Sequence, residues 1–152
     1  MFLATPLAAE DWPQFRGVNA SGVSTASAPL PTTFSQDENL KWSVKVGDGI
    51  GCPIVVAGKV YTTAMTAEQT FSVFAFEAAS GKPLWRKDFE TGKLPRITPP
   101  NSHASSTPAG DGERVYVSFS TLGLLALNAS DGSTAWKFPL PTPSYLMDWG
   151  AA

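Results

Sequence analysis

The stretch Ala75-Phe-Glu-Ala-Ala-Ser-Gly-Lys-Pro-Leu-Trp85 returns fifty-one residues later as Ala126-Leu-Asn-Ala-Ser-Asp-Gly-Ser-Thr-Ala-Trp136. In both copies a Gly follows the Ala by six positions, and a Trp follows that Gly by four. Self-similarity over such a distance is typical of supersecondary units that stack side by side. The repeat therefore predicts the architecture of the chain before it says anything about function.

Short apolar runs separated by turn residues surround both copies, and no window keeps the 3.6-residue period of an amphipathic helix. Asp111-Gly112 is a dipeptide that readily supplies the positive φ of a hairpin, and Ala57-Gly58 marks another hairpin. We expect an all-β fold in which each unit is a four-stranded antiparallel meander. The predicted strands are 53–56, 59–65, 70–76 and 83–89 in the first unit and 106–110, 114–119, 123–127 and 134–138 in the second.

The two units do not have the same length. Val60-Tyr61 precedes Val115-Tyr116 by 55 residues, whereas the Trp residues of the two copies are 51 apart, so the second unit is shorter in its middle connection. A further strand is predicted over 40–46, where Leu40, Trp42, Val44 and Val46 alternate with polar residues and share one face. The Pro-rich segment 90–105 is predicted to be a loop on one rim.

Composition limits the classes of function. The chain has 152 residues, a net charge of −2 and no run of Lys or Arg, which argues against a nucleic-acid partner. Cys52 is the only cysteine, so an intramolecular disulfide and a thiolate metal cluster are both excluded within this sequence. We expect Cys52 to be a small core residue.

Three regions are expected along the chain. Residues 1–9 resemble the remnant of an export signal, with small residues before an abrupt polar change at Glu10-Asp11, and this predicts an exported protein of the periplasm or cell envelope. Residues 10–39 are predicted to be an extended entry arm, and residues 40–152 to hold the repeats. No apolar run approaches the roughly 20 residues that a membrane-spanning helix needs.

The two copies resemble the tryptophan-docking motif A-x-D-x-x-T-G-x-x-x-W of the PQQ-like (quinoprotein alcohol dehydrogenase-like) β-propellers. Asp11-Trp-Pro-Gln-Phe-Arg-Gly17 also resembles the start of secreted bacterial members of that family. The resemblance implies that the meanders are propeller blades of a ring that usually has eight. We therefore expect an N-terminal fragment with about two to three blades, whose missing blades complete the same propeller.

The resemblance also implies roles for single residues. In the family the Trp packs between blades, against the Ala of its own motif and near the Gly of a neighbouring blade. The Asp of the motif is replaced by Glu77 and Asn128 and its Thr by Ser80 and Asp131, all of them polar residues suited to a turn. The structural docking residues predicted in this way are Ala75, Gly81, Trp85, Ala126, Gly132 and Trp136, with Trp85 and Trp136 largely buried.

Quinone-dependent dehydrogenases similar to these repeats hold their cofactor over Ca²⁺ with Glu, Asn and Asp ligands, and many carry an adjacent Cys pair. This sequence has no such pair and no acidic set that maps onto that site, so no catalytic, cofactor-binding or metal-ligating residue is predicted. His103, the only histidine, has two interpretations. It is either a rim residue hydrogen-bonded to its own loop or a ligand contact facing the central funnel.

Two functions remain open. The first is a non-catalytic propeller scaffold of the bacterial cell envelope, similar to the propeller lipoproteins of the Bam complex, that binds a protein or carbohydrate partner. The alternative is a fragment of a quinone-dependent dehydrogenase whose cofactor site lies in the missing blades. Fold alone does not decide between them, because function depends on sites built onto a fold.

Overall fold

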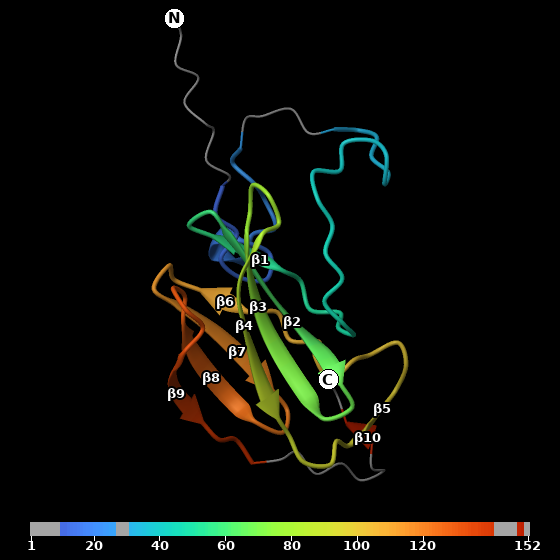
Figure 1. The fold of residues 1–152 in the computed structure, drawn as a ribbon, viewed down its shortest axis with the longest axis vertical. Coiled ribbons are helices and arrows are strands. Elements are labelled where there is room, and N and C mark those ends of the chain that lie inside the picture. Colours follow the sequence, from blue (N-terminus) through green and yellow to red (C-terminus); the bar gives the residue numbers. More distant parts are fainter. Residues whose placement is uncertain (1–9, 27–30, 142–148, 151–152) are drawn as a thin grey trace, which may run out of the picture.

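The computed structural model describes residues 10–26, 31–141 and 149–150 of the chain. Two four-stranded antiparallel sheets pack against one another, and each is a simple meander in sequence order (Figure 1). Sheet 1 contains β1 (Ile54–Val56), β2 (Lys59–Ala67), β3 (Thr70–Glu77) and β4 (Pro83–Glu90). Sheet 2 contains β6 (Ala109–Gly110), β7 (Arg114–Phe119), β8 (Gly123–Asn128) and β9 (Thr134–Phe138). The predicted all-β fold of antiparallel meanders is confirmed.

The core lies between the facing sides of the two sheets. In β7 buried and partly buried residues alternate, so that Val115, Val117 and Phe119 point to sheet 1. Phe71 of β3 stacks on Phe119 with ring centroids 4.3 Å apart. Burying such aromatic and β-branched side chains stabilises each sheet through its neighbour, because neither sheet has another way to cover this face.

Tight turns fix the register of both sheets. Ala57 and Gly58 both have positive φ, 49° and 72°, as a two-residue hairpin turn requires. At the ends of β3 and β8 the same turn occurs twice. Gly81 N–H donates to the Glu77 carbonyl and Gly132 N–H to the Asn128 carbonyl, and both glycines have a φ of 72°. The repeat seen in the sequence is therefore a repeat of backbone conformation.

The unequal length of the units lies in one hairpin. Tyr61 pairs with Ala75 and Tyr116 with Ala126, and beyond those pairs the β2–β3 hairpin continues further than the β7–β8 hairpin does. The β7–β8 ladder ends at Phe119 opposite Gly123, whereas the β2–β3 ladder continues to Ala67 opposite Thr70. The end of the β2–β3 hairpin thus has no counterpart in sheet 2.

The N-terminal segment contacts both sheets. Trp12 exchanges two backbone hydrogen bonds with Val55, at 2.6 and 3.0 Å, and the Pro13 carbonyl accepts from Gly110 N–H of β6. A short 3₁₀ turn, η1 (Val18–Ala20), follows.

Within the described ranges, no helix has the length and apolar character to cross a bilayer. The predicted export-signal remnant at 1–9 lies outside the described residues.

Three expectations from the sequence are wrong in detail. Residues 40–46 form no strand, because they run over the face of sheet 1 with no ladder partner alongside, and Leu40 and Val44 are exposed. Cys52 is exposed, because it precedes β1 at the edge of the sheet. The loop 90–105 contains a two-residue strand, β5 (Arg96–Ile97), that pairs in parallel with β10 (Trp149–Gly150).

The close approach of one sheet to the turn of the other gives a stability prediction. A Cβ at Gly132 would lie 2.6 Å from Trp85 Cε3, whereas a Cβ at Gly58 would meet nothing within 4 Å, and both glycines have a φ of 72°. We expect Gly58→Ala to cost about 1–2 kcal/mol for the left-handed backbone alone. Gly132→Ala should cost about 1–3 kcal/mol more, because the indole must move. Urea unfolding of the two variants measures the difference, and equal losses would contradict close packing at Gly132.

Candidate functional site

The predicted docking residues form one Ala–Trp pair within each sheet, and one of the two Trp residues reaches the other sheet. Ala75 lies opposite Trp85 across β3 and β4, and Ala126 lies opposite Trp136 across β8 and β9. Each Trp is therefore beside the Ala of its own copy, where the small side chain leaves room for an indole. A shift of register follows each of these pairs along the ladder, between Ala75 and Phe76 and at the equivalent place in sheet 2.

Trp85 extends from sheet 1 onto the turn of sheet 2. Its ring lies over Gly132, and its indole N–H donates to the Ala129 carbonyl at 3.1 Å. The buried Tyr61 hydroxyl donates to the same carbonyl at 3.3 Å, and the Tyr61 and Trp85 rings are 5.8 Å apart. Burial raises the pKa of Tyr61, so its hydroxyl remains a donor at neutral pH. One carbonyl of sheet 2 thus holds two aromatic side chains of sheet 1.

The same arrangement recurs one unit earlier. Trp42 lies over Gly81, with its Cδ2 atom 2.6 Å from the position of a glycine Cβ, and its indole N–H donates to the Ala78 carbonyl at 2.9 Å. Within the N-terminal segment, Trp12 also covers a glycine of positive φ, Gly17. An indole over a left-handed glycine is therefore the recurrent contact of this chain.

Trp136 differs from the prediction that it is largely buried, because 37% of it is exposed. Its ring lies 6.1 Å from Tyr116, in the same tilted arrangement as the Tyr61–Trp85 pair. No described residue supplies a turn that covers this pair, and Phe138 beside it is also exposed. The repeat predicted the position of Trp136 correctly but not its burial, which depends on a neighbouring element.

His103 lies at the edge of a cavity of about 530 Å³, at the end of sheet 1 opposite the β3–β4 turn. Its Nδ1 atom is buried and has no hydrogen-bond partner, so the predicted hydrogen bond to its own loop is not formed at this nitrogen. Burial lowers the pKa of His103, and the nearby Asp48 carboxylate opposes that effect. The imidazole is therefore neutral at pH 7.

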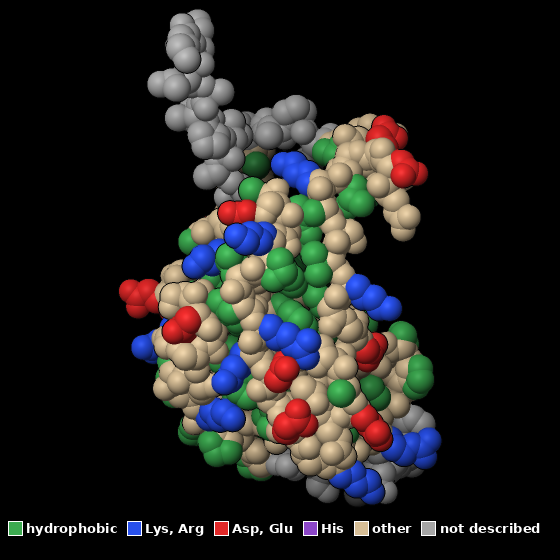
Figure 2. All heavy atoms as spheres, in the orientation of Figure 1, with side chains coloured by type: hydrophobic (Ala, Val, Ile, Leu, Met, Phe, Trp, Pro, Cys, Tyr) green, Lys and Arg blue, Asp and Glu red, His purple; other side chains and the backbone are tan. Residues whose placement is uncertain are grey.

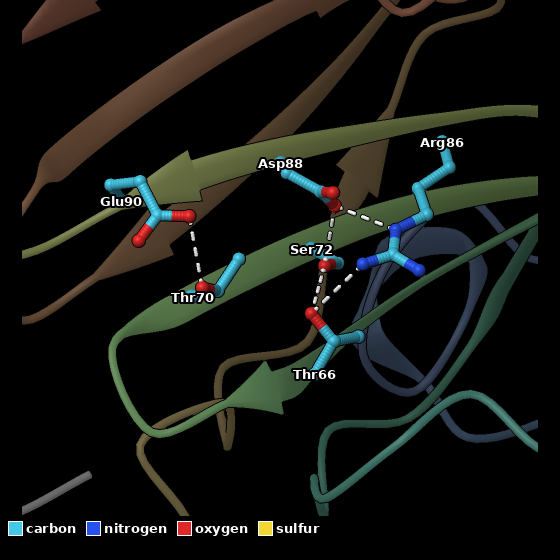
Figure 3. Close-up of polar contacts among 6 residues, drawn as sticks. All are labelled: Thr66, Thr70, Ser72, Arg86, Asp88 and Glu90. Carbon is cyan, nitrogen blue, oxygen red and sulfur yellow. Dashed lines mark hydrogen bonds and ion pairs between the residues drawn. The ribbon is translucent and has the colours of Figure 1, made fainter.

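A polar network joins three strands next to this cavity (Figure 3). The Ser72 hydroxyl donates to Asp88 at 2.7 Å and lies 2.7 Å from the Thr66 hydroxyl, which also lines the cavity. Arg86 donates to both Asp88 and Thr66, at 2.7 and 3.1 Å. The hydrogen bond from Arg86 is the main cause that lowers the pKa of Asp88. Separately, Thr70 donates to Glu90 at 2.9 Å. These bonds hold the end of the β2–β3 hairpin against β4.

The face of the molecule drawn in Figure 2 carries no single dominant charge. Figure 2 shows Lys, Arg, Asp and Glu side chains interspersed among hydrophobic ones on the face drawn. Among the residues that the structure describes, no three His, Cys, Asp or Glu side chains converge as metal ligands would. Sequence reasoning singled out His103 but missed the contribution of Asp48 and of the β2–β3 hairpin, since their approach to His103 depends on how the sheets stack.

Comparison with known proteins identifies relatives of this arrangement. The family described as outer membrane protein assembly factor BamB matches residues 23–149. The outer membrane protein assembly factor BamB of Shewanella oneidensis is 32% identical over 127 residues, which is 78% of this chain and 30% of that protein. That of Escherichia coli is 31% identical over 122 residues, 72% of this chain and 29% of that protein. This chain thus spans about three tenths of the length of these relatives.

Two further similarities are more limited. A quinohemoprotein alcohol dehydrogenase of Pseudomonas putida, ADH IIB, is 33% identical over 92 residues, covering 60% of this chain but 13% of that enzyme. The crystal structure of BamB from Moraxella catarrhalis covers 67% of this chain and 40% of its own, with 16% identity and a TM-score of 0.33.

The two copies of the Trp contact allow a paired mutational test. Trp85→Ala should cost about 3–5 kcal/mol of unfolding free energy, because it removes a packed aromatic ring. Trp136→Ala should cost at least about 1 kcal/mol less, since this ring is more exposed and its indole makes no hydrogen bond to a described residue. Chemical denaturation of both variants measures the difference. Equal losses would mean that contact with Gly132 and Ala129 contributes little.

The neutral His103 gives a pH prediction. Its folded pKa lies below the ordinary value of about 6.5, so the unfolded chain binds more protons as the pH falls below 6.5. Stability should therefore be highest above pH 6.5 and decline as the pH falls through the folded pKa. His103→Gln should flatten this decline between about pH 7.5 and 5.5, because no other side chain ordinarily titrates there. Unfolding free energies across that interval check it, and an unchanged slope in the variant would count against a lowered pKa of the partly buried imidazole.

Proposed function

This chain belongs to the family of the outer membrane protein assembly factor BamB, and we propose that it forms part of a non-catalytic β-propeller that binds a polypeptide partner in the cell envelope. The observation that supports this most directly is the family match across residues 23–149, which includes both sheets. Relatives named for outer membrane protein assembly favour a protein partner over a carbohydrate one.

The arrangement of side chains agrees with a scaffold role. The residues that repeat between the two units, such as Trp85 and Gly132, contact one another and hold the sheets together. A site for chemistry would instead bring titratable or nucleophilic groups together, and the repeated positions do not do so. We therefore assign the six docking residues to packing between blades.

We further propose that the exposed side of sheet 2 receives another blade of the same propeller. Tyr116 and Trp136 form a tilted pair like that of Tyr61 and Trp85. In the latter pair the hydroxyl and the indole N–H both donate to the Ala129 carbonyl. Phe138 lies two residues after Trp136 on β9 and is 60% exposed, and it extends this apolar surface. A turn with the conformation of the one around Gly132 would complete the contact.

The proposal also includes a periplasmic location, with an export-signal remnant at 1–9 and an entry arm at 10–39.

Deleting the gene that contains this sequence tests the proposed function. We expect the amount of correctly assembled outer membrane protein in the source cell to fall, and reintroduction of the intact gene to restore it. Quantitative proteomics of outer membrane fractions is the measurement, with total synthesis of the same proteins as the control. A normal outer membrane together with loss of quinone-dependent alcohol oxidation would instead support the dehydrogenase alternative.

A further inference from the structure

The cavity beside His103 combines apolar walls with acidic groups. Met65, Leu94 and Pro95 supply hydrophobic surface, and Asp48, Glu68 and His103 supply polar groups, around a volume of about 530 Å³. Three separate parts of the chain meet here: the segment before β1, the β2–β3 hairpin and the loop that follows β4. None of the docking residues lines the cavity, so packing between the sheets does not account for it.

The hairpin extension forms one wall. Met65 and Glu68 belong to the part of the β2–β3 hairpin that continues beyond the length of the β7–β8 hairpin. An indole covers the turn glycine both in sheet 1, which has this extension, at Gly81, and in sheet 2, which lacks it, at Gly132, so this contact does not depend on the extension. Phe71 of this extension packs on Phe119 in the core, whereas Met65 and Glu68 line the cavity and shape it.

The segments before β1 and β6 form the opposite side. Asp48 precedes His103 by the same 55 residues that separate Val60 from Val115, so the two occupy equivalent positions in adjacent units. The fully buried Ser102 hydroxyl donates to Asp48 Oδ2 at 2.8 Å, and two backbone hydrogen bonds between Asp48 and Met65 hold the segment against β2. The Asp48 carboxylate is thus fixed in place by the protein.

The charge of the cavity is negative. Asp48 and Glu68 are the acidic residues that line it, while burial lowers the pKa of His103 and so favours its neutral form. Among the described residues no Lys or Arg lines the cavity, and Arg86, which donates to the lining residue Thr66, is already paired with Asp88 at 2.7 Å. The Glu68 side chain makes no hydrogen bond or ion pair to any residue that the structure describes. An acidic group without a partner above an apolar wall is suited to a ligand with a positive end and a hydrophobic stem.

We propose that this cavity binds a long cationic side chain, Lys or Arg, of the polypeptide partner. The aliphatic stem lies along Met65, Leu94 and Pro95, and the charged end lies between Asp48 and Glu68. This inference rests on the proposed function only in taking the partner to be a polypeptide. A divalent cation fits less well, because the acidic groups and His103 do not converge as metal ligands do among the described residues.

The probe for the test is Nα-acetyl-lysine methylamide, added to the ¹⁵N-labelled intact protein. Nα-acetyl-norleucine methylamide is the matched control, because it has an aliphatic side chain but no ammonium group. We expect saturable shifts of the amide signals of Asp48, Glu68 and His103 with the lysine probe and much smaller ones with the norleucine probe. Glu68→Gln should weaken the lysine probe by about two- to fivefold, the usual effect of one exposed ion pair. Asp48→Asn should weaken it by at least as much.

Two controls keep the outcome interpretable. Glu113→Gln removes the same charge from an exposed turn outside the cavity and should leave lysine-probe affinity unchanged. Asp48→Asn also weakens the hydrogen bond that the Ser102 hydroxyl donates to Asp48. The unfolding free energy of this variant must therefore be measured together with its probe affinity. Glu68→Gln disturbs no internal bond of the described chain and therefore gives the decisive result.

Equal responses to both probes, or lysine binding that is unchanged in Glu68→Gln, would overturn the inference. Its failure is distinguishable from failure of the proposed function. Normal outer membrane assembly after gene deletion would contradict the proposed function. The measured binding of the lysine probe to the cavity would still stand. The converse outcome would reject only the cavity inference. In that case gene deletion causes an assembly defect, the Glu68→Gln gene restores assembly fully, and the lysine probe does not bind at the cavity.

Discussion

The contact on which the rest of the structure depends is the indole of Trp85 over Gly132. It combines three physical requirements: a glycine that has no Cβ and a positive φ, a carbonyl that accepts the indole N–H, and a small Ala beside the ring. Apolar burial between the sheets is nondirectional and would tolerate several packings. The hydrogen bond to Ala129 and the fit over the glycine select one of them. The recurrence of the contact at Trp42 and Gly81 indicates that it sets the spacing of the whole repeat.

Much of this could be predicted from the sequence. The strands of both sheets follow from alternation and from turn dipeptides, because these are local properties, and the described strand at 114–119 has the predicted bounds. Properties that depend on a neighbour could not be predicted. The exposure of Trp136, the absence of a strand at 40–46 and the exposure of Cys52 all depend on what lies alongside each residue. The cavity belongs to the same class, since Asp48 and His103 approach only through stacking of the units.

The two parts of the molecule described here differ in how they use the repeat. At the Trp85 contact the equivalent residues of both units keep the same type, because the geometry of the turn demands it. In the segments before β1 and β6 the equivalent residues are Asp48 and His103, which share a position in the repeat but differ in charge. In these two units the residues that hold the sheets together keep their type, whereas Asp48 and His103, which line the cavity, do not. This division separates the residues that stabilise the stacked sheets from those that line the cavity.

The unequal hairpins have a consequence for how such proteins diversify. A β-hairpin can gain residues two at a time, one on each strand, and each such step keeps the side-chain alternation and every pairing behind it. The β2–β3 hairpin is longer than β7–β8 by the pairs Met65–Phe71 and Ala67–Thr70, with a register shift between Met65 and Ala67, and its added end forms a wall of the acidic cavity. Lineages could therefore deepen, flatten or recharge a recognition surface by changing hairpin length, while the stacked frame stays unaltered. Paired insertions at hairpin tips are accordingly a place to look when related propellers recognise different partners.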